Sequence, residues 1–186
     1  MNVSDAISTR RSIKKFTSRS ITREEMETLL SAAVAAPNHR LTQPWRFYVL
    51  GPDARQAYGE VLGGRKARKI EDPQAAQTMR DTVAAEHRAL PGMLVVAIAD
   101  NENPEIREED YAAVMMAIQN LSLAALELGF GTHLKTGAIM TDPAARAAAG
   151  VKDNERIVAV VNVGEPAEVP AAKTRQPASA FTTWRD

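Results

Sequence analysis

The chain has 186 residues, of which 45% are hydrophobic and 25% are charged, and its 23 basic side chains balance 23 acidic ones. We expect one globular domain over residues 1–186, and the balanced charge argues against a nucleic-acid binder. Because the sequence has no cysteine and its three histidines lack the spacing of a helical pair, we expect no disulfide, no thiolate nucleophile and no metal site.

The first half of the chain predicts four helices and one strand. Thr22 followed by Glu25 forms a capping box, and apolar residues recur behind it at helical spacing until Pro37 ends the helix. A polar stretch at 63–72 predicts an exposed loop. The expected elements are helices at 3–9, 22–36, 53–62 and 73–88 and a strand within 45–50.

The second half predicts two buried strands, at 93–100 and 156–164, and a short helix at 142–149. From residue 166 onward the sequence is spaced by prolines, so we expect an extended tail that becomes ordered by docking onto another surface. Helices and strands alternate along the chain. We therefore expect an α+β domain with three layers, α/β/α, and a mixed, mainly antiparallel sheet flanked by helices.

The longest expected helix covers 108–128, after an acidic surface loop at 101–107 that contains Pro104. It is apolar nearly all round, which is typical of a helix buried on more than one side, and we expect a partner subunit to cover the second side. Polar residues interrupt its most apolar window, and the first residues lack a long apolar run. We therefore expect neither a membrane helix nor a signal peptide, and a cytoplasmic protein.

The zero net charge hides a segregation of charge along the chain. Residues 1–20 and 170–186 are each basic, whereas residues 100–110 are strongly acidic. If the two basic ends meet, they form a compact anion site. The stretch 10–16 offers guanidinium, hydroxyl and ammonium donors, which suit a phosphate, although a solvated basic face is the alternative. Lys173 and Arg175 form a second cationic cluster in the tail.

Two further stretches contain candidate binding residues. Between the helix at 22–36 and the following strand, Asn38 could bind the polar edge of a heterocycle and His39 could donate to an anion or supply a proton, unless both are simply exposed. In the stretch 129–137, Leu134 precedes the Lys-Thr pair where a P-loop needs glycine. This stretch predicts an extended backbone that lies along a flat ring beside Lys135, or a plain connector.

Together these stretches resemble the nitroreductase family of flavoproteins, and more closely its small YdjA-like branch. Residues 10–16 are similar to the family pattern Arg-Arg-Ser-[Ile/Val]-[Arg/Lys]-x-[Phe/Tyr]. Residues 36–47 are similar to Ala-Pro-[Ser/Asp/Asn]-x-x-x-x-Gln-Pro-Trp-x-Phe, and His39 points to the branch. The order and spacing match from residue 1 to about residue 177.

The resemblance implies an FMN bound at the interface of an intertwined homodimer. Ala35, Pro37, Asn38 and His39 match the loop contributed by the other subunit, where Ala35 lacks the charge that some relatives have. Lys135 stands where arginine is common, and Leu134 where some relatives have an aromatic residue. The implied contacts within one subunit are Arg10, Arg11, Ser12, Lys14, Leu134, Lys135, Thr136, Lys173 and Arg175.

The resemblance also implies an NAD(P)H-dependent oxidoreductase in which hydride reaches flavin N5 and passes to a nitroaromatic, a quinone or a similar acceptor in a ping-pong cycle. It implies no certain catalytic side chain: Lys14, Lys135 and His39 are candidates for electrostatic stabilisation or proton donation. The alternatives are a flavoenzyme of the same fold with another reaction, such as ene reduction or dehalogenation, and a non-catalytic flavin carrier or sensor.

Overall fold

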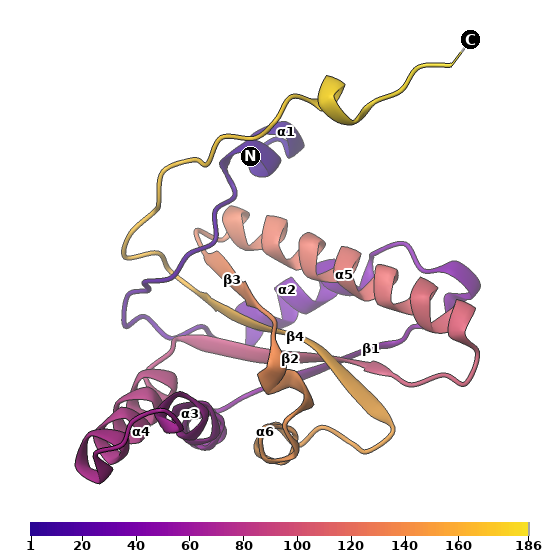
Figure 1. The fold of residues 1–186 in the computed structure, drawn as a ribbon. Helices are drawn as coiled ribbons and strands as arrows, with labels where there is room; N and C mark the ends of the chain where they lie inside the picture. Colours follow the sequence, from indigo (N-terminus) through magenta and orange to yellow (C-terminus); the bar gives the residue numbers. More distant parts are fainter. Residues whose placement is uncertain (186) are drawn as a thin grey trace.

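A four-stranded sheet lies at the centre of the structure, which is a computed structural model that describes residues 1–185 (Figure 1). Each neighbouring pair of strands runs antiparallel. Within the described residues, parallel pairing is limited to an isolated bridge between Ser12 and Thr132. The α+β class is therefore confirmed. In sheet order the strands are β1 (Trp45–Val49), β2 (Gly92–Ala99), β4 (Glu155–Gly164) and β3 (Gly131–Lys135).

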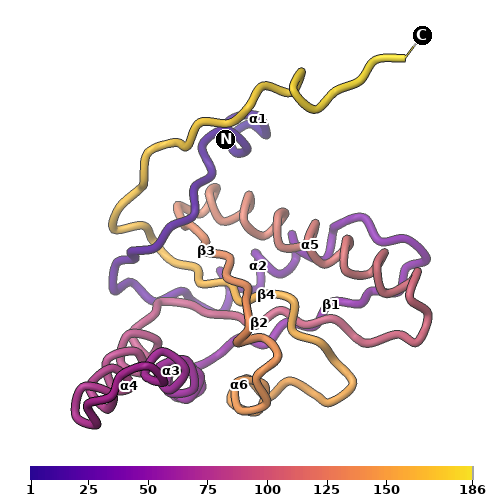
Figure 2. Tube along the Cα trace, in the orientation of Figure 1, coloured from indigo at the N-terminus to yellow at the C-terminus, as the bar shows by residue number. Residues whose placement is uncertain are grey.

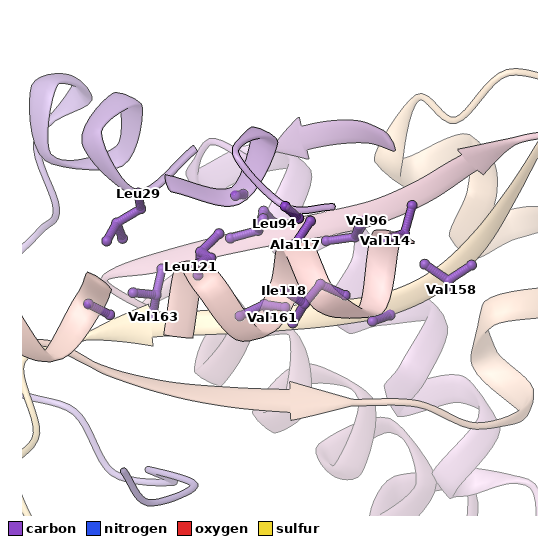
Figure 3. Close-up of a cluster of buried hydrophobic side chains, with 14 of the residues drawn as sticks. Leu29, Leu94, Val96, Val114, Ala117, Ile118, Leu121, Val158, Val161 and Val163 are labelled. Atoms are coloured by element: carbon purple, nitrogen blue, oxygen red, sulfur yellow. The ribbon is translucent and has the colours of Figure 1, made fainter. Parts of the chain in front are cut away.

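Helices α2 (Arg23–Val34) and α5 (Pro104–Glu127) cover one face of the sheet. The predicted capping box is present at the start of α2, where Thr22 and Glu25 bond reciprocally. Behind it, buried residues of α2 meet α5 and the two central strands in one apolar cluster (Figure 3). This cluster includes Leu29, Leu94, Val96, Val114, Ala117, Ile118, Leu121, Val158, Val161 and Val163.

The opposite face carries α3 (Pro52–Ala67), α4 (Pro73–Arg88) and α6 (Pro143–Ala149). Tyr58 of α3 and the alanines of α6 bury the apolar side chains of this face, and α4 packs on α3. The expected three layers are thus observed.

The predicted loop at 63–72 is wrong for its first half, because α3 continues to Ala67. Two glycines of α3 allow close packing of two helices. A Cβ on Gly59 would lie 2.8 Å from the His87 Cβ, and one on Gly63 would lie 2.8 Å from the Arg80 Cα. Those distances are too short for real Cβ atoms, so α4 approaches α3 to a distance that only glycine permits.

Two adjacent glycines provide a matched test of this packing. We expect Gly63→Ala to lower the free energy of unfolding by about 1–2 kcal/mol, since the new methyl group has no room. Gly64 has no atom within 4 Å of a built Cβ, so Gly64→Ala should raise it by about 0.5–1 kcal/mol through helix propensity alone. Urea unfolding of both variants measures the difference, and equal effects would contradict the close packing.

Helix α5 begins earlier than the sequence predicted, at Pro104 instead of residue 108. Pro104 occupies the first helical turn, where a missing N–H costs nothing, and the Asn103 side chain accepts from the Glu105 N–H at 2.9 Å. One side of α5 is buried against the sheet, but Tyr111 and Met116 on its other side are 40% and 41% exposed. Within residues 1–185, no helix is long and apolar enough to cross a membrane.

The extended backbone predicted after α5 forms β3 at the sheet edge, and the chain leaves the sheet after β4. Residues 165–185 run past α1 (Val3–Thr9) and away from the layers (Figure 2). They contain one short turn and expose Phe181 and Trp184 by 78% and 89%. The short 3-10 turns are η1 (His39–Leu41), η2 (Ala138–Thr141) and η3 (Ala178–Phe181).

Candidate functional site

The two ends of the chain are joined along one short stretch of backbone. Phe16 and Pro166 form an antiparallel bridge. On either side of it, the Thr17 N–H donates to the Glu165 carbonyl at 2.9 Å and the Ala167 N–H donates to the Lys15 carbonyl at 3.0 Å. The tail therefore returns along the N-terminal segment.

The basic N-terminal segment is fixed against β3 by Ile13. This side chain is 3% exposed, and its N–H donates to the Thr132 carbonyl at 2.9 Å. Such contact requires Gly131, because a Cβ there would lie 2.2 Å from the Ile13 side chain. Neighbours in an extended chain point to opposite sides. Burial of Ile13 therefore turns Ser12 and Lys14 outward, and both are exposed.

Both basic ends line one cleft of about 550 Å³ beside α1, which we call the basic cleft. The expectation that the ends meet is confirmed. Arg11 bonds to backbone carbonyls and Lys15 pairs with Glu168 at 2.7 Å. Within residues 1–185, no carboxylate pairs with the other cations of the cleft, which are Arg10, Lys14, Lys173 and Arg175.

Lys14 also lines a second cavity of about 510 Å³, the sheet-edge cavity, together with Lys135, His133, His87 and Asn162. Burial lowers the pKa of Lys135, and the nearby Lys66 lowers it further. No sequence motif marks Asn162, which also lines this cavity. The residue is 3% exposed, and within residues 1–185 its Oδ1 has no hydrogen-bond partner, so a donor from a ligand would satisfy it.

His87 makes stability depend on pH. Burial lowers the pKa of His87, whose Nδ1–H donates to the Val83 carbonyl at 2.8 Å. The unfolded chain therefore takes up this proton at higher pH than the folded chain, and stability should fall as pH drops below about 6.5. We expect His87→Leu to reduce the dependence of the free energy of unfolding on pH in this range. Urea unfolding between pH 8 and about 5.5 tests it, and an unchanged slope would show that other groups are responsible.

The remaining predicted site residues lie elsewhere in this chain. Ala35, Pro37, Asn38 and His39 belong to the connection between α2 and β1, near the first turns of α5. Within one chain they line neither the basic cleft nor the sheet-edge cavity. Leu134 is 38% exposed on the edge strand β3, and Thr136 follows it in exposed chain.

Residues 38–43, which we call the Asn38 loop, are held to α5 by acidic side chains. The His39 Nδ1 lies 2.8 Å from Glu109 Oε1, and the Arg40 Nε lies 3.1 Å from Glu109 Oε2. Thr42 bonds to the buried Asp110. In the sequence, the acidic stretch at 100–110 indicates only a region of opposite charge to the two basic ends. Its helical spacing would have placed Glu105 and Glu109 on one face, but their partner was not recognisable from the sequence.

The fold and the joined basic ends define a known class of protein: the chain belongs to the nitroreductase family, whose model matches residues 7–165. It is 35% identical over 176 residues to "Putative NAD(P)H nitroreductase YfhC" of Bacillus subtilis, covering 93% of this chain and 89% of that one. It is 28% identical to "Putative NAD(P)H nitroreductase YdjA" of Escherichia coli, covering 89% of each. The predicted family and branch are confirmed.

Solved structures share the fold along the whole chain. A nitroreductase-like family protein from Bacillus cereus has a TM-score of 0.85 at 25% identity, covering 100% of this chain and 97% of its own. A nitroreductase from Bacteroides fragilis, described with bound FMN, has a TM-score of 0.77 at 21% identity, with full coverage of both chains. The second comparison shows the fold alone.

Proposed function

We propose that this chain binds FMN and acts as an NAD(P)H-dependent oxidoreductase on nitroaromatic, quinone or similar acceptors. The observation that carries the proposal is the basic cleft, where Arg10, Lys14, Lys173 and Arg175 converge without a carboxylate partner within residues 1–185. Like charges gathered in this way repel one another, so an anionic ligand stabilises them. The names of YfhC and YdjA support the activity.

The donors of the basic cleft fit the phosphate of FMN. Arg10 and Arg175 provide planar guanidinium groups that can each bind two oxygens, Lys173 provides a point charge, and Ser12 a short hydroxyl donor. Lys14 lines both the basic cleft and the sheet-edge cavity. There Asn162 can accept a hydrogen bond from a ring N–H while Lys14 and Lys135 donate to ring carbonyls.

When bound, FMN would supply hydride chemistry at its N5 atom, in a ping-pong cycle between NAD(P)H and the acceptor. The side chains of this chain would bind and orient the group. Lys14 and Lys135 would place positive charge beside the ring, where reduction adds negative charge. Backbone of Leu134–Thr136 would lie along the ring. His39 is the proposed proton donor or anion contact.

We further propose a homodimer in which two copies of α5 pack together. The chain exposes 11,297 Å², whereas a folded monomer of 20.2 kDa exposes about 8,800 Å². The difference, about 2,500 Å² per copy or about 5,000 Å² for two copies, is at the upper part of the range of obligate interfaces, and the extended tail at 165–185 contributes to it. Met116, near the middle of α5, is exposed and apolar.

A two-fold axis at the middle of α5 would complete the site. The basic cleft lies by the C-terminal end of α5, where Thr132 meets the N-terminal segment, and the Asn38 loop lies by the N-terminal turns. The helix has 24 residues and is therefore about 36 Å long. Antiparallel packing of two copies would place the Asn38 loop of each copy beside the cleft of the other.

Purified protein tests the proposal directly. We expect a yellow protein that holds one FMN per chain and oxidises NADH or NADPH faster than the same concentration of free FMN, with an added nitroaromatic or quinone as acceptor. A colourless protein that FMN does not reconstitute would overturn the proposal. Bound FMN without such turnover would favour a carrier, and an anaerobic panel of acceptors separates nitro reduction from ene reduction and dehalogenation.

A further inference from the structure

The Asn38 loop has a strained backbone that its surroundings must hold. Arg40, Leu41 and Gln43 have φ of 61°, 52° and 45°, a region that side-chain-bearing residues rarely occupy. Strain of this kind persists only where neighbouring contacts over-determine the conformation, and it is concentrated at functional sites. The contacts that hold the loop therefore indicate which of its side chains are available to a ligand.

Polar contacts hold the loop from inside and from α5. Asn38 Oδ1 accepts from the Gln43 N–H at 2.7 Å, and Thr42 bonds to the buried Asp110. The guanidinium of Arg40 is turned onto α5, with Nε 3.1 Å from Glu109 and Nη2 3.4 Å from Glu105. Its charge is therefore neutralised within the chain, so Arg40 is not the cation that the loop offers outward.

His39 is held differently. Its Nδ1 lies 2.8 Å from Glu109 Oε1, yet 68% of its side chain is exposed. A carboxylate only accepts hydrogen bonds, so Nδ1 must be the nitrogen that bears the proton. The opposite nitrogen, Nε2, is then the ring nitrogen left for a ligand, on a side chain that is largely exposed. The hydrogen bond from His39 is also the main cause of the lowered pKa of Glu109, which keeps that carboxylate charged.

We propose that Glu109 is a positioning residue, which orients His39 so that Nε2 contacts the anionic ligand in the basic cleft of a second copy of this chain. The inference rests on the proposed function and its two-fold arrangement. The hydrogen bond to Glu109 occupies Nδ1 and fixes the orientation of the ring, so Nε2 is the nitrogen that meets the ligand. Among the described residues, the side-chain contacts of the Asn38 loop with α5 involve three further charged groups, Arg40, Glu105 and Asp110.

The first test is spectroscopic and needs no bound cofactor. Long-range ¹H–¹⁵N spectra of the histidine rings, recorded above pH 8, report which nitrogen carries the proton. We expect His39 to be a single Nδ1–H tautomer in the unsubstituted chain and in Glu109→Gln, whose amide oxygen still accepts. Glu109→Ala should shift it toward the Nε2–H form, which free histidine prefers. Glu108→Ala, one residue away and exposed, is the matched control. An unshifted tautomer in Glu109→Ala would overturn the inference.

The second test measures FMN affinity by fluorescence quenching. We expect Glu109→Ala to raise the Kd about tenfold, as loss of a ring-orienting partner does elsewhere, with rescue by Glu109→Gln and no change in Glu108→Ala. Arg40→Leu separates loop anchoring from ring orientation, since it leaves the His39–Glu109 pair in place. If Arg40→Leu lost as much FMN affinity as Glu109→Ala, or if Glu109→Ala lost none, the inference would be overturned while the proposed function would stand. Failure of the unsubstituted chain to bind FMN would instead overturn the proposed function.

Discussion

Replacing Arg10 and Arg175 together by alanine should remove the cofactor. A charge-assisted hydrogen bond contributes about 1.5–3 kcal/mol, so loss of both guanidinium groups should raise the Kd for FMN by about 10²- to 10⁴-fold. Both residues line the basic cleft, one from each end of the chain. Because they lie outside the apolar core, we expect the variant to fold with unchanged stability or a small gain, since repulsion between the cations is relieved.

The measurement is the flavin absorbance of the purified variant, followed by titration with FMN. Arg23→Ala with Arg185→Ala is the matched control, because it removes the same charge from two positions outside the basic cleft. Arg23 pairs on the surface with Glu27, and Arg185 is exposed, so neither lies in the basic cleft. A control that loses FMN equally would show that total charge governs binding, and not the cleft.

The local elements were predictable because their signals are short-range. Thr22 and Glu25 identify the start of α2 within four residues, and β2 and β4 are apolar runs that the sheet buries on both faces. The predictions that failed involve residue types that occur both at the ends of helices and inside them. Proline ends helices in general, but Pro104 begins α5, and Gly63 permits close packing of α3 on α4. Which of these roles such a residue has depends on the element that packs beside it.

Some residues of the candidate site could likewise be predicted from the sequence, and others could not. Charge segregation indicated two basic ends that would form an anion site on meeting, and both ends line the basic cleft. No periodicity indicated Asn162, which is a polar residue within the apolar run of a buried strand. Glu109 was visible only as part of an acidic stretch, because its partner His39 is 70 residues away in sequence. Contacts at that separation depend on the tertiary fold, which local patterns do not contain.

The strongest test of the shared site is complementation between two defective chains. In the mixed dimer, one chain carries Arg10→Ala and Arg175→Ala, and the other chain carries His39→Ala. Each chain therefore lacks a different part of the site. If the Asn38 loop acts on the other copy, one site combines both defects and the other is intact. We then expect about 0.5 FMN per chain, bound with the affinity of the unsubstituted protein.

Co-expression with two different affinity tags isolates the mixed dimer, and fluorescence titration gives its stoichiometry and Kd. If the loop instead acted on its own chain, the intact cleft would face a loop without His39, and its single site would bind about tenfold more weakly. Homodimers of each variant provide the reference values. The outcome depends on geometry alone, because both arrangements contain the same substitutions in the same numbers. It therefore decides directly whether the 24-residue helix α5 brings loop and cleft of different copies together.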